Sequence, residues 1–299
     1  MAVTVDVAPP IVFLVAYLFY FVVLLLFYAK GTIRWRSRYS FIMFHVVLRL
    51  AGMACGIAFS VLTWEDNEDV KKNVLIAYLV FSAEGYFSLI VCAYRFLIVW
   101  QEDRFGASPL EPRIPKGTSF RRRWRMHARA PIALLHWGLI SANALIIAGS
   151  SIMAGAIGEE GKQNDITTGK GLRVAGTAVF LSLAQVFLLL CVKSFRRQGD
   201  RTLALITVLW VFLTVRGVYG IISVVLPAYS YSSSEAYTQD GFTSTFLIGE
   251  HVMGSLMEWL AAGFLIATHY SSVVGGAELV EEPISDASRD EEALVEMRK

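Results

Sequence analysis

Apolar residues fill seven long stretches of the chain, and short polar segments separate these stretches. A helix needs roughly 20 mainly apolar residues to cross a hydrocarbon core about 30 Å thick. The predicted spans are residues 9–28, 40–63, 74–100, 131–157, 174–192, 202–226 and 244–270. Composition agrees, because 55% of the 299 residues are hydrophobic and only 17% are charged. We therefore predict an all-α integral membrane protein with seven transmembrane helices.

The polar segments outside the spans are too short to bury a core of their own. We predict a single seven-helix domain over residues 1–270, followed by an acidic and disordered tail over residues 271–299. The first span has no basic segment before it and no small-residue cleavage pattern after it. It is therefore expected to remain as an uncleaved membrane anchor.

The distribution of Lys and Arg predicts the orientation of the helices. The connections after the first, third and fifth spans are rich in both, whereas residues 229–242, after the sixth span, contain neither. Because cytosolic loops carry the excess of basic residues, we predict an N-terminus outside the cytosol and a cytosolic C-terminus. The basic run at residues 121–125 is expected to contact anionic lipid headgroups, not nucleic acid.

The chain lacks the motifs of metal and nucleotide enzymes. Cys55, Cys92 and Cys191 all fall within predicted spans, at spacings that fit neither a metal site nor a disulfide framework. The sequence has no glycine-rich phosphate loop and no His-Glu-x-x-His pattern. We expect no metal, no cofactor, no nucleic acid and no obligate protein partner.

Six ionisable residues inside the predicted spans are the candidates for chemistry. They are His45, Arg49, Glu84, Arg216, Glu250 and Glu258. A charged side chain at mid-bilayer costs at least about 2.5 kcal/mol, so such residues usually have a function. The polar residues Asn143 and Gln185 are expected to form hydrogen bonds between helices.

Two arginines and three glutamates suggest a specific pairing. We predict that Arg49 pairs with Glu84, and that Arg216 pairs with Glu250 or Glu258. One carboxyl would then remain without a cation, and in an apolar site such a group favours its neutral, proton-donating form. The alternative is that the ion pairs only tie the helices together.

The spacing of these residues contains a weak internal echo. Arg49 precedes Glu84 by 35 residues, and Arg216 precedes Glu250 by 34. This similarity predicts a 3+1+3 parallel repeat, in which the fourth helix joins two three-helix halves. The two Arg–Glu sets would then face each other across a central cavity.

Receptors and carriers are the alternative classes of seven-helix protein. The sequence Glu102-Asp103-Arg104-Phe105 is similar to the acidic-Arg-aromatic triplet of rhodopsin-like receptors, but the last span has no Asn-Pro-x-x-Tyr stretch. It also has no lysine for a retinal Schiff base. Seven-helix carriers usually have prolines inside their spans, whereas here the prolines near the spans lie at their ends, which predicts a stiff bundle. The receptor is the lesser alternative and the carrier the stronger one.

The run Arg216-Gly217-Val218-Tyr219, followed by Glu258-Trp259 in the last span, resembles fungal seven-helix membrane proteins. These include a lipid-translocating-exporter-like group and the membrane-bound terpene cyclases of meroterpenoid pathways. The likeness covers roughly residues 9–270 and is mostly architectural. The resemblance to the cyclases implies that membrane-embedded carboxylic acids protonate an epoxide or alkene of a prenylated substrate and start its cyclisation, without a redox cofactor.

The predicted function is therefore an isomerase-type or lyase-type terpene cyclase of secondary metabolism, with a small-molecule or lipid transporter as the alternative. Its substrate would be an apolar prenylated molecule that enters from the lipid bilayer, and the endoplasmic reticulum is expected in preference to the plasma membrane. The candidate acids are Glu84, Glu250 and Glu258. The residues expected to bind substrate or tune the acid are His45, Arg49, Tyr86, Arg216, Tyr219 and Trp259. Aromatic faces stabilise cationic intermediates, and Phe87, Tyr94, Trp137 and Trp210 are further candidates for the cavity wall.

Overall fold

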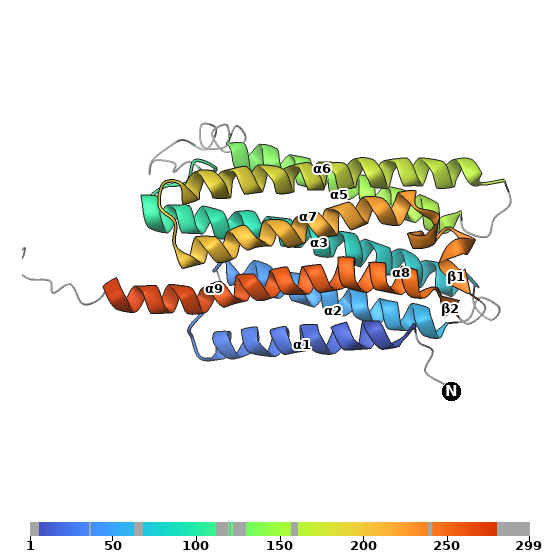
Figure 1. Ribbon diagram of the computed structural model, residues 1–299, viewed down its shortest axis with the longest axis horizontal. Coiled ribbons are helices and arrows are strands. Elements are labelled where there is room, and N and C mark those ends of the chain that lie inside the picture. The colour runs from blue at the N-terminus through green and yellow to red at the C-terminus, as the bar shows by residue number, and fades with distance from the viewer. Residues whose placement is uncertain are drawn as a thin grey trace, which may run out of the picture.

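The computed structural model describes residues 6–35, 37–62, 68–111, 119, 121, 130–156, 161–238 and 241–279. Within these residues, seven helices are long and apolar enough to cross a membrane, which confirms the predicted class of a multi-pass all-α membrane protein. Figure 1 shows them side by side in an elongated bundle. The first six spans are α1 (Ala8–Ala29), α2 (Tyr39–Val61), α3 (Glu68–Phe105), α5 (Pro131–Gly155), α6 (Gln163–Phe195) and α7 (Arg201–Val225). The seventh joins α8 (Ser244–Ile248), the π-helix η3 (Gly249–Leu256) and α9 (Met257–Leu279).

Several helices are longer than the apolar runs that predicted them. The last span continues past residue 270, the predicted end of the seven-helix domain, and ends at Leu279, so residues 271–279 are helical where a disordered tail was predicted. Residues 280–299 lie outside the described residues. Helix α6 begins at Gln163, so Arg173 lies almost three turns inside it although the predicted span began at residue 174. The polar first turns of α6 are held against α5 by glycine contacts. A Cβ atom on Gly169 would lie 2.6 Å from the carbonyl oxygen of Gly149, so only small residues allow this approach.

Each helix packs against its neighbours in sequence, and α3 also contacts α6, α7 and α9. Helix α1 also contacts η3 and α9 of the last span, so the first and last helices close the helices into a ring. Helix α5 packs along α6 as a full member of this ring. Consecutive helices pack together within each predicted half, α1 to α3 and α6 to α9, and the 3+1+3 parallel repeat stays a prediction.

The connection between α7 and α8, residues 226–243, covers the end of the bundle at which α1 begins (Figure 1). We call this segment the cap. It contains η1 (Pro227–Tyr229), η2 (Ser234–Ala236) and the antiparallel pair β1 (Tyr237–Thr238) and β2 (Gly241–Phe242). The ring of Tyr231 packs edge-on against Phe246, 4.7 Å between centroids, and the backbone N–H of Phe242 donates to Asp6 at 3.0 Å. The cap is thus tied to the bundle by aromatic packing and one hydrogen bond to the N-terminal segment.

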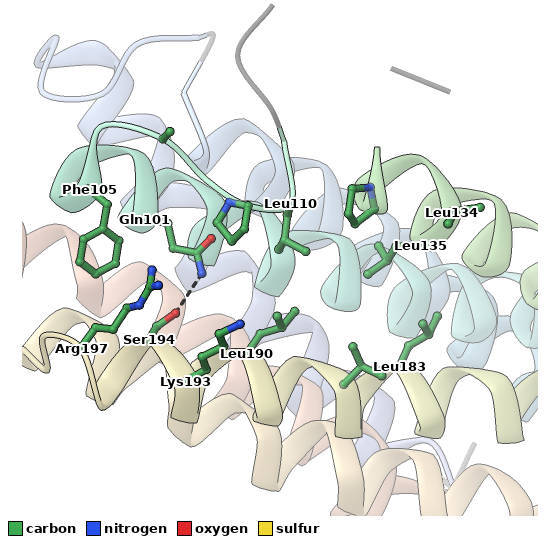
Figure 2. A pocket seen from close by; sticks show the side chains of 14 residues that line it. Gln101, Phe105, Leu110, Leu134, Leu135, Leu183, Leu190, Lys193, Ser194 and Arg197 are labelled. Carbon is green, nitrogen blue, oxygen red and sulfur yellow. Dashed lines mark hydrogen bonds between the residues drawn. The ribbon is translucent and has the colours of Figure 1, made fainter. Parts of the chain in front are cut away.

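At the opposite end, polar contacts join α3 to α6 and α7. Gln101 Nε2 donates to Ser194 Oγ at 2.9 Å (Figure 2). Asp200 caps α7 by accepting from the backbone N–H of Leu203 at 2.8 Å, and it pairs with Arg104 Nη2 at 2.8 Å. Trp100 Nε1 also donates to it, at 3.1 Å. Partial burial raises the pKa of Asp200, but these hydrogen bonds and the Arg104 charge outweigh burial, so its pKa lies below the usual value.

The first prediction concerns this aspartate. Asp200→Asn keeps the helix cap but removes the charge, whereas Asp200→Ala removes both. We expect both variants to unfold at a lower temperature than the wild type in detergent at about pH 7, with Ala the less stable, because an N-cap side chain contributes about 1 kcal/mol.

The pH dependence has a defined sign. Because the folded pKa of Asp200 is below the unfolded value of about 3.9, its stabilising contribution is present above that pH and is lost as the pH falls through the folded pKa. The difference in unfolding temperature between the wild type and Asp200→Asn should therefore shrink between about pH 7 and about pH 3. A difference that stays constant over this range would contradict the assignment.

Candidate functional site

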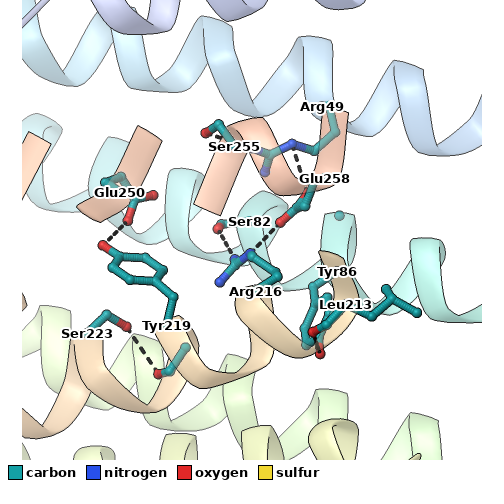
Figure 3. Close-up of polar contacts among 12 residues, drawn as sticks. Arg49, Ser82, Tyr86, Leu213, Arg216, Tyr219, Ser223, Glu250, Ser255 and Glu258 are labelled. Atoms are coloured by element: carbon teal, nitrogen blue, oxygen red, sulfur yellow. Dashed lines mark hydrogen bonds and ion pairs between the residues drawn. The ribbon is translucent and has the colours of Figure 1, made fainter. Parts of the chain in front are cut away.

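The centre of the bundle is organised by Glu258 on α9, whose two oxygens face two arginines (Figure 3). Glu258 Oε1 accepts from Arg216 Nε of α7 at 2.6 Å, and Glu258 Oε2 lies 3.2 Å from Arg49 Nε of α2. The side chain of Glu258 is 0% exposed. The predicted pairing of Arg216 with one of the last-span glutamates is confirmed, and we call these three residues the clamp.

The predicted pair between Arg49 and Glu84 is wrong. Helix α3 presents Gly85 to the clamp, and a Cβ atom there would lie 2.7 Å from Arg49 Cδ and 3.0 Å from Glu258 Oε2. Because neighbouring residues of a helix point about 100° apart, Glu84 faces α5 instead. There it accepts from Asn143 Nδ2 at 2.5 Å, so the predicted interhelical role of Asn143 is confirmed.

Hydroxyl groups and aromatic rings complete the surroundings of the clamp. Ser82 Oγ accepts from Arg216 Nη2 at 3.1 Å, and Ser255 Oγ accepts from Arg49 Nη2 at 3.3 Å. The Tyr86 ring centroid lies 5.4 Å from the guanidinium carbon of Arg216. These contacts provide the arginine donors with partners that water cannot supply inside a membrane.

His45, predicted beside Arg49, lies next to the clamp without a hydrogen bond to Glu258. Its Nδ1 atom is 3.0 Å from Ser88 Oγ and 3.1 Å from the carbonyl oxygen of Gly85. His45 therefore fixes α2 against α3 just behind the glycine that makes room for Arg49.

Glu250 forms a second cluster nearer the cap, within the π-helix η3. Its Oε1 accepts from Tyr78 Oη at 2.6 Å and its Oε2 from Tyr219 Oη at 2.9 Å. The Tyr219 ring reaches Glu250 because Gly249 faces it; a Cβ atom on Gly249 would lie 3.0 Å from the ring. π-Helical turns inside α-helices are rare, and those that do occur are often found at functional sites.

A small cavity of about 40 Å³ lies beside this second cluster. Its polar lining consists of Ser82, Tyr86, Ser150, Arg173, Thr177, Arg216, Tyr219, Ser223, Tyr231 and Glu250. The lining thus combines an edge of the clamp, the Glu250 cluster and the tyrosine that the cap inserts.

Arg173 is the functional candidate that sequence reasoning missed. It lies one residue before the predicted fifth span, so it was not counted among the intramembrane charges. Among the described residues, no carboxylate lies within salt-bridge distance of Arg173, and its one recorded polar contact is a 4.0 Å approach of Nη1 to Met153 Sδ. The hydroxyl of Ser150, which lines the same cavity, is buried and has no hydrogen-bond partner. Within the part of the chain that the structure describes, the cavity therefore contains a cation without an ion-pair partner and a hydroxyl without a hydrogen-bond partner.

The predicted aromatic wall is only partly present. Tyr86 and Tyr219 line the cavity, but Tyr86 Oη is already bonded to the carbonyl oxygen of Leu213 at 2.7 Å. Trp259 stacks on Tyr20 of α1 at 5.0 Å and does not line the cavity.

The other aromatic candidates also lie elsewhere. Trp137 is 64% exposed on α5. Trp210 Nε1 donates to Gln185 Oε1 at 3.0 Å, which confirms the interhelical bond expected of Gln185. Tyr94 Oη donates to the carbonyl oxygen of Leu183, and Phe87 lines an apolar groove on the outer surface between α2, α3 and α5.

No protein-family model matches the chain, and neither a curated protein nor a solved structure is significantly similar to it.

The second prediction tests the clamp. Glu258→Leu leaves two buried arginines without their carboxylate and should cost about 3–5 kcal/mol of stability, measured by thermal unfolding in detergent. In a double-mutant cycle, Arg216→Leu and Glu258→Leu should be non-additive by at least about 0.5 kcal/mol, because the two residues are in direct contact.

The matched control is the cycle of Arg49→Leu with Glu84→Leu, residues that the sequence paired but the structure separates. These two changes should be additive. If the Arg49–Glu84 cycle showed the coupling and the Arg216–Glu258 cycle did not, the clamp would be incorrectly assigned.

Proposed function

We propose that this chain is a membrane carrier for a small monovalent anion, which binds in the cavity beside Arg173. The observation that supports the proposal is the guanidinium of Arg173, which lines a small polar cavity without a carboxylate in salt-bridge distance among the described residues, together with the hydroxyl of Ser150, which has no hydrogen-bond partner there. A buried cation without a partner is costly in a membrane. An anion in the cavity would supply both missing hydrogen-bond acceptors.

The balance of charge around the cavity favours one negative charge in the ligand. Among the residues that line the cavity, Arg173 and Arg216 provide two positive charges and Glu250 provides one negative charge, which leaves a net charge of +1. A monovalent anion would neutralise the group.

Glu84 stands outside this balance. It lies against Asn143, between α3 and α5, and does not line the cavity.

The size of the cavity distinguishes the carrier from the cyclase. A water molecule needs roughly 10–15 Å³ of such space, so about 40 Å³ accommodates a small ion or a few waters. Drug-sized ligands occupy pockets of about 300–1,000 Å³, so a farnesyl chain would require the bundle to open widely. Glu258 is also a poor candidate for the acid, because both its oxygens face arginines and it is fully buried. Terpene cyclisation stays a prediction that this geometry does not favour.

A carrier must open its site to each side of the membrane in turn. At the end of the bundle where α1 begins, the buried Tyr231 of the cap lines the cavity and would form the barrier on that side. Towards the other end, the clamp holds α2, α7 and α9 together. In the proposed cycle these two barriers open alternately. The membrane concerned and the side on which the N-terminus lies stay predictions, with the endoplasmic reticulum and a non-cytosolic N-terminus expected.

The third prediction tests transport. Purified protein is reconstituted into liposomes that contain a chloride-quenched dye, and chloride influx is measured alone and in competition with nitrate, formate and acetate. We expect chloride influx, or the degree to which one of these anions inhibits it, to be about tenfold or more lower in Arg173→Met than in the wild type. In Arg173→Lys, which retains the charge, the same quantity should be largely kept. Lys170→Met, the same change one turn earlier on α6 and outside the cavity lining, is the matched control.

Thermal unfolding separates a binding role of Arg173 from a structural one. In the absence of small anions, Arg173→Met should be at least as stable as the wild type, because the change removes an unpaired buried cation. Added chloride should stabilise the wild type and not the variant.

Three outcomes would overturn the proposal. They are wild-type liposomes that pass none of the four anions, an Arg173→Met protein that unfolds far below the wild type, and membranes that convert a farnesylated aromatic epoxide into an isomer of unchanged mass. The last outcome would restore the cyclase.

A further inference from the structure

A second and much larger hollow lies at the end of the bundle opposite the cap, between α3, α5 and α6 (Figure 2). Its volume is about 590 Å³, and its walls are mainly apolar, with leucines from α5, from α6 and from the segment that follows α3. These include Leu110, Leu134, Leu135, Leu183 and Leu190. We call it the basal groove. It shares no lining residue with the polar cavity beside Arg173.

Two cations stand on one side of the basal groove. Lys193 lies in the last turn of α6 and Arg197 lies two residues after the end of that helix; both are exposed, and within the described part of the chain neither has a carboxylate partner. The guanidinium of Arg197 lies 5.9 Å from the Phe105 ring centroid.

Two nearby arginines differ from this pair. Arg95 is bound to Glu111 at 2.7 Å, and Arg104 is bound to Asp200 at 2.8 Å. The charge of Lys193 and Arg197 is therefore left uncompensated beside an apolar hollow.

We propose that the basal groove binds one anionic phospholipid, with its phosphate between Lys193 and Arg197 and an acyl chain along the leucines. The groove follows α6 from Lys193 to Leu183, ten residues that span roughly 15 Å, towards the middle of the membrane. This is the direction that an acyl chain takes from a headgroup at the interface. The volume lies within the range of about 300–1,000 Å³ that is usual for small-molecule sites.

Charge argues against the neighbouring connection as the occupant. Residues 112–129 contain seven Lys or Arg and no Asp or Glu, so their sequence adds positive charge and cannot neutralise the pair. The tail at residues 280–299 is acidic, but it offers mostly polar side chains to an apolar groove. An amphiphile with an anionic head matches both the charge and the walls.

The fourth prediction compares lipids in delipidated protein in detergent. Binding of phosphatidylglycerol and of phosphatidylcholine with the same acyl chains is measured by native mass spectrometry, with glycerol phosphate as the headgroup alone. We expect the wild type to bind phosphatidylglycerol at least about tenfold more tightly than phosphatidylcholine, and glycerol phosphate only weakly. Lys193→Gln with Arg197→Gln should remove this preference.

Two further variants make the test specific. Arg196→Gln with Arg201→Gln removes the same charge at the same end of the bundle, outside the groove lining, and should keep the preference. Leu135→Trp places a larger side chain in the apolar wall of the groove and should weaken the binding of both lipids. Its unfolding temperature is measured to show that the variant is folded.

Equal binding of the two lipids would mean non-specific annular lipid, and tight binding of glycerol phosphate would mean a soluble phosphate site. If the preference for phosphatidylglycerol appeared only after removal of residues 280–299, the acidic tail would be the occupant of the groove in the full-length chain. Each of these results would overturn the proposal.

Discussion

The rest of the interior depends on one constraint, which is the burial of Glu258 between two arginines in a medium that offers no water to either charge. The 2.6 Å and 3.2 Å contacts join α7, α9 and α2 at a single point. Gly85 brings α3 into the same point, because any larger residue there would displace Arg49. Burial makes each charge costly alone, so the packing of four helices is coupled to the integrity of one carboxylate.

Sequence reasoning located the charges but not all of their partners. Hydropathy was sufficient for the seven helices, and the central position of Arg216 was sufficient to expect a last-span glutamate beside it. The sequence could not predict the partner of Arg49, because that partner depends on how each helix is rotated about its own axis. Glu84 and Gly85 differ by one position and by about 100° in direction, and a spacing of 34 or 35 residues between helices does not encode that angle.

Arg173 and the π-helix were missed for a related reason. The turns before Arg173 are polar, so a hydropathy window ends there, although glycine contacts with α5 continue the helix. A regular helix would place Glu250 and Glu258, which are eight residues apart, on broadly the same side. The π-helical turns of η3 and the glycine at 249 instead give Glu250 its own tyrosine partners, one layer away from the clamp. Local backbone irregularity of this kind leaves no periodic signal in the sequence.

A carboxylate shared by two arginines has a consequence for the proposed carrier. If either Arg49 or Arg216 moved away, Glu258 would keep one cation, so separating α7 from α2 does not strand the carboxylate. Arg216 also lines the cavity, where an anion held by Arg173 would lie within reach of its guanidinium. An entering anion would then replace Glu258 as a partner of Arg216 and lower the cost of opening the clamp. Ligand binding and helix separation would be coupled through that one side chain.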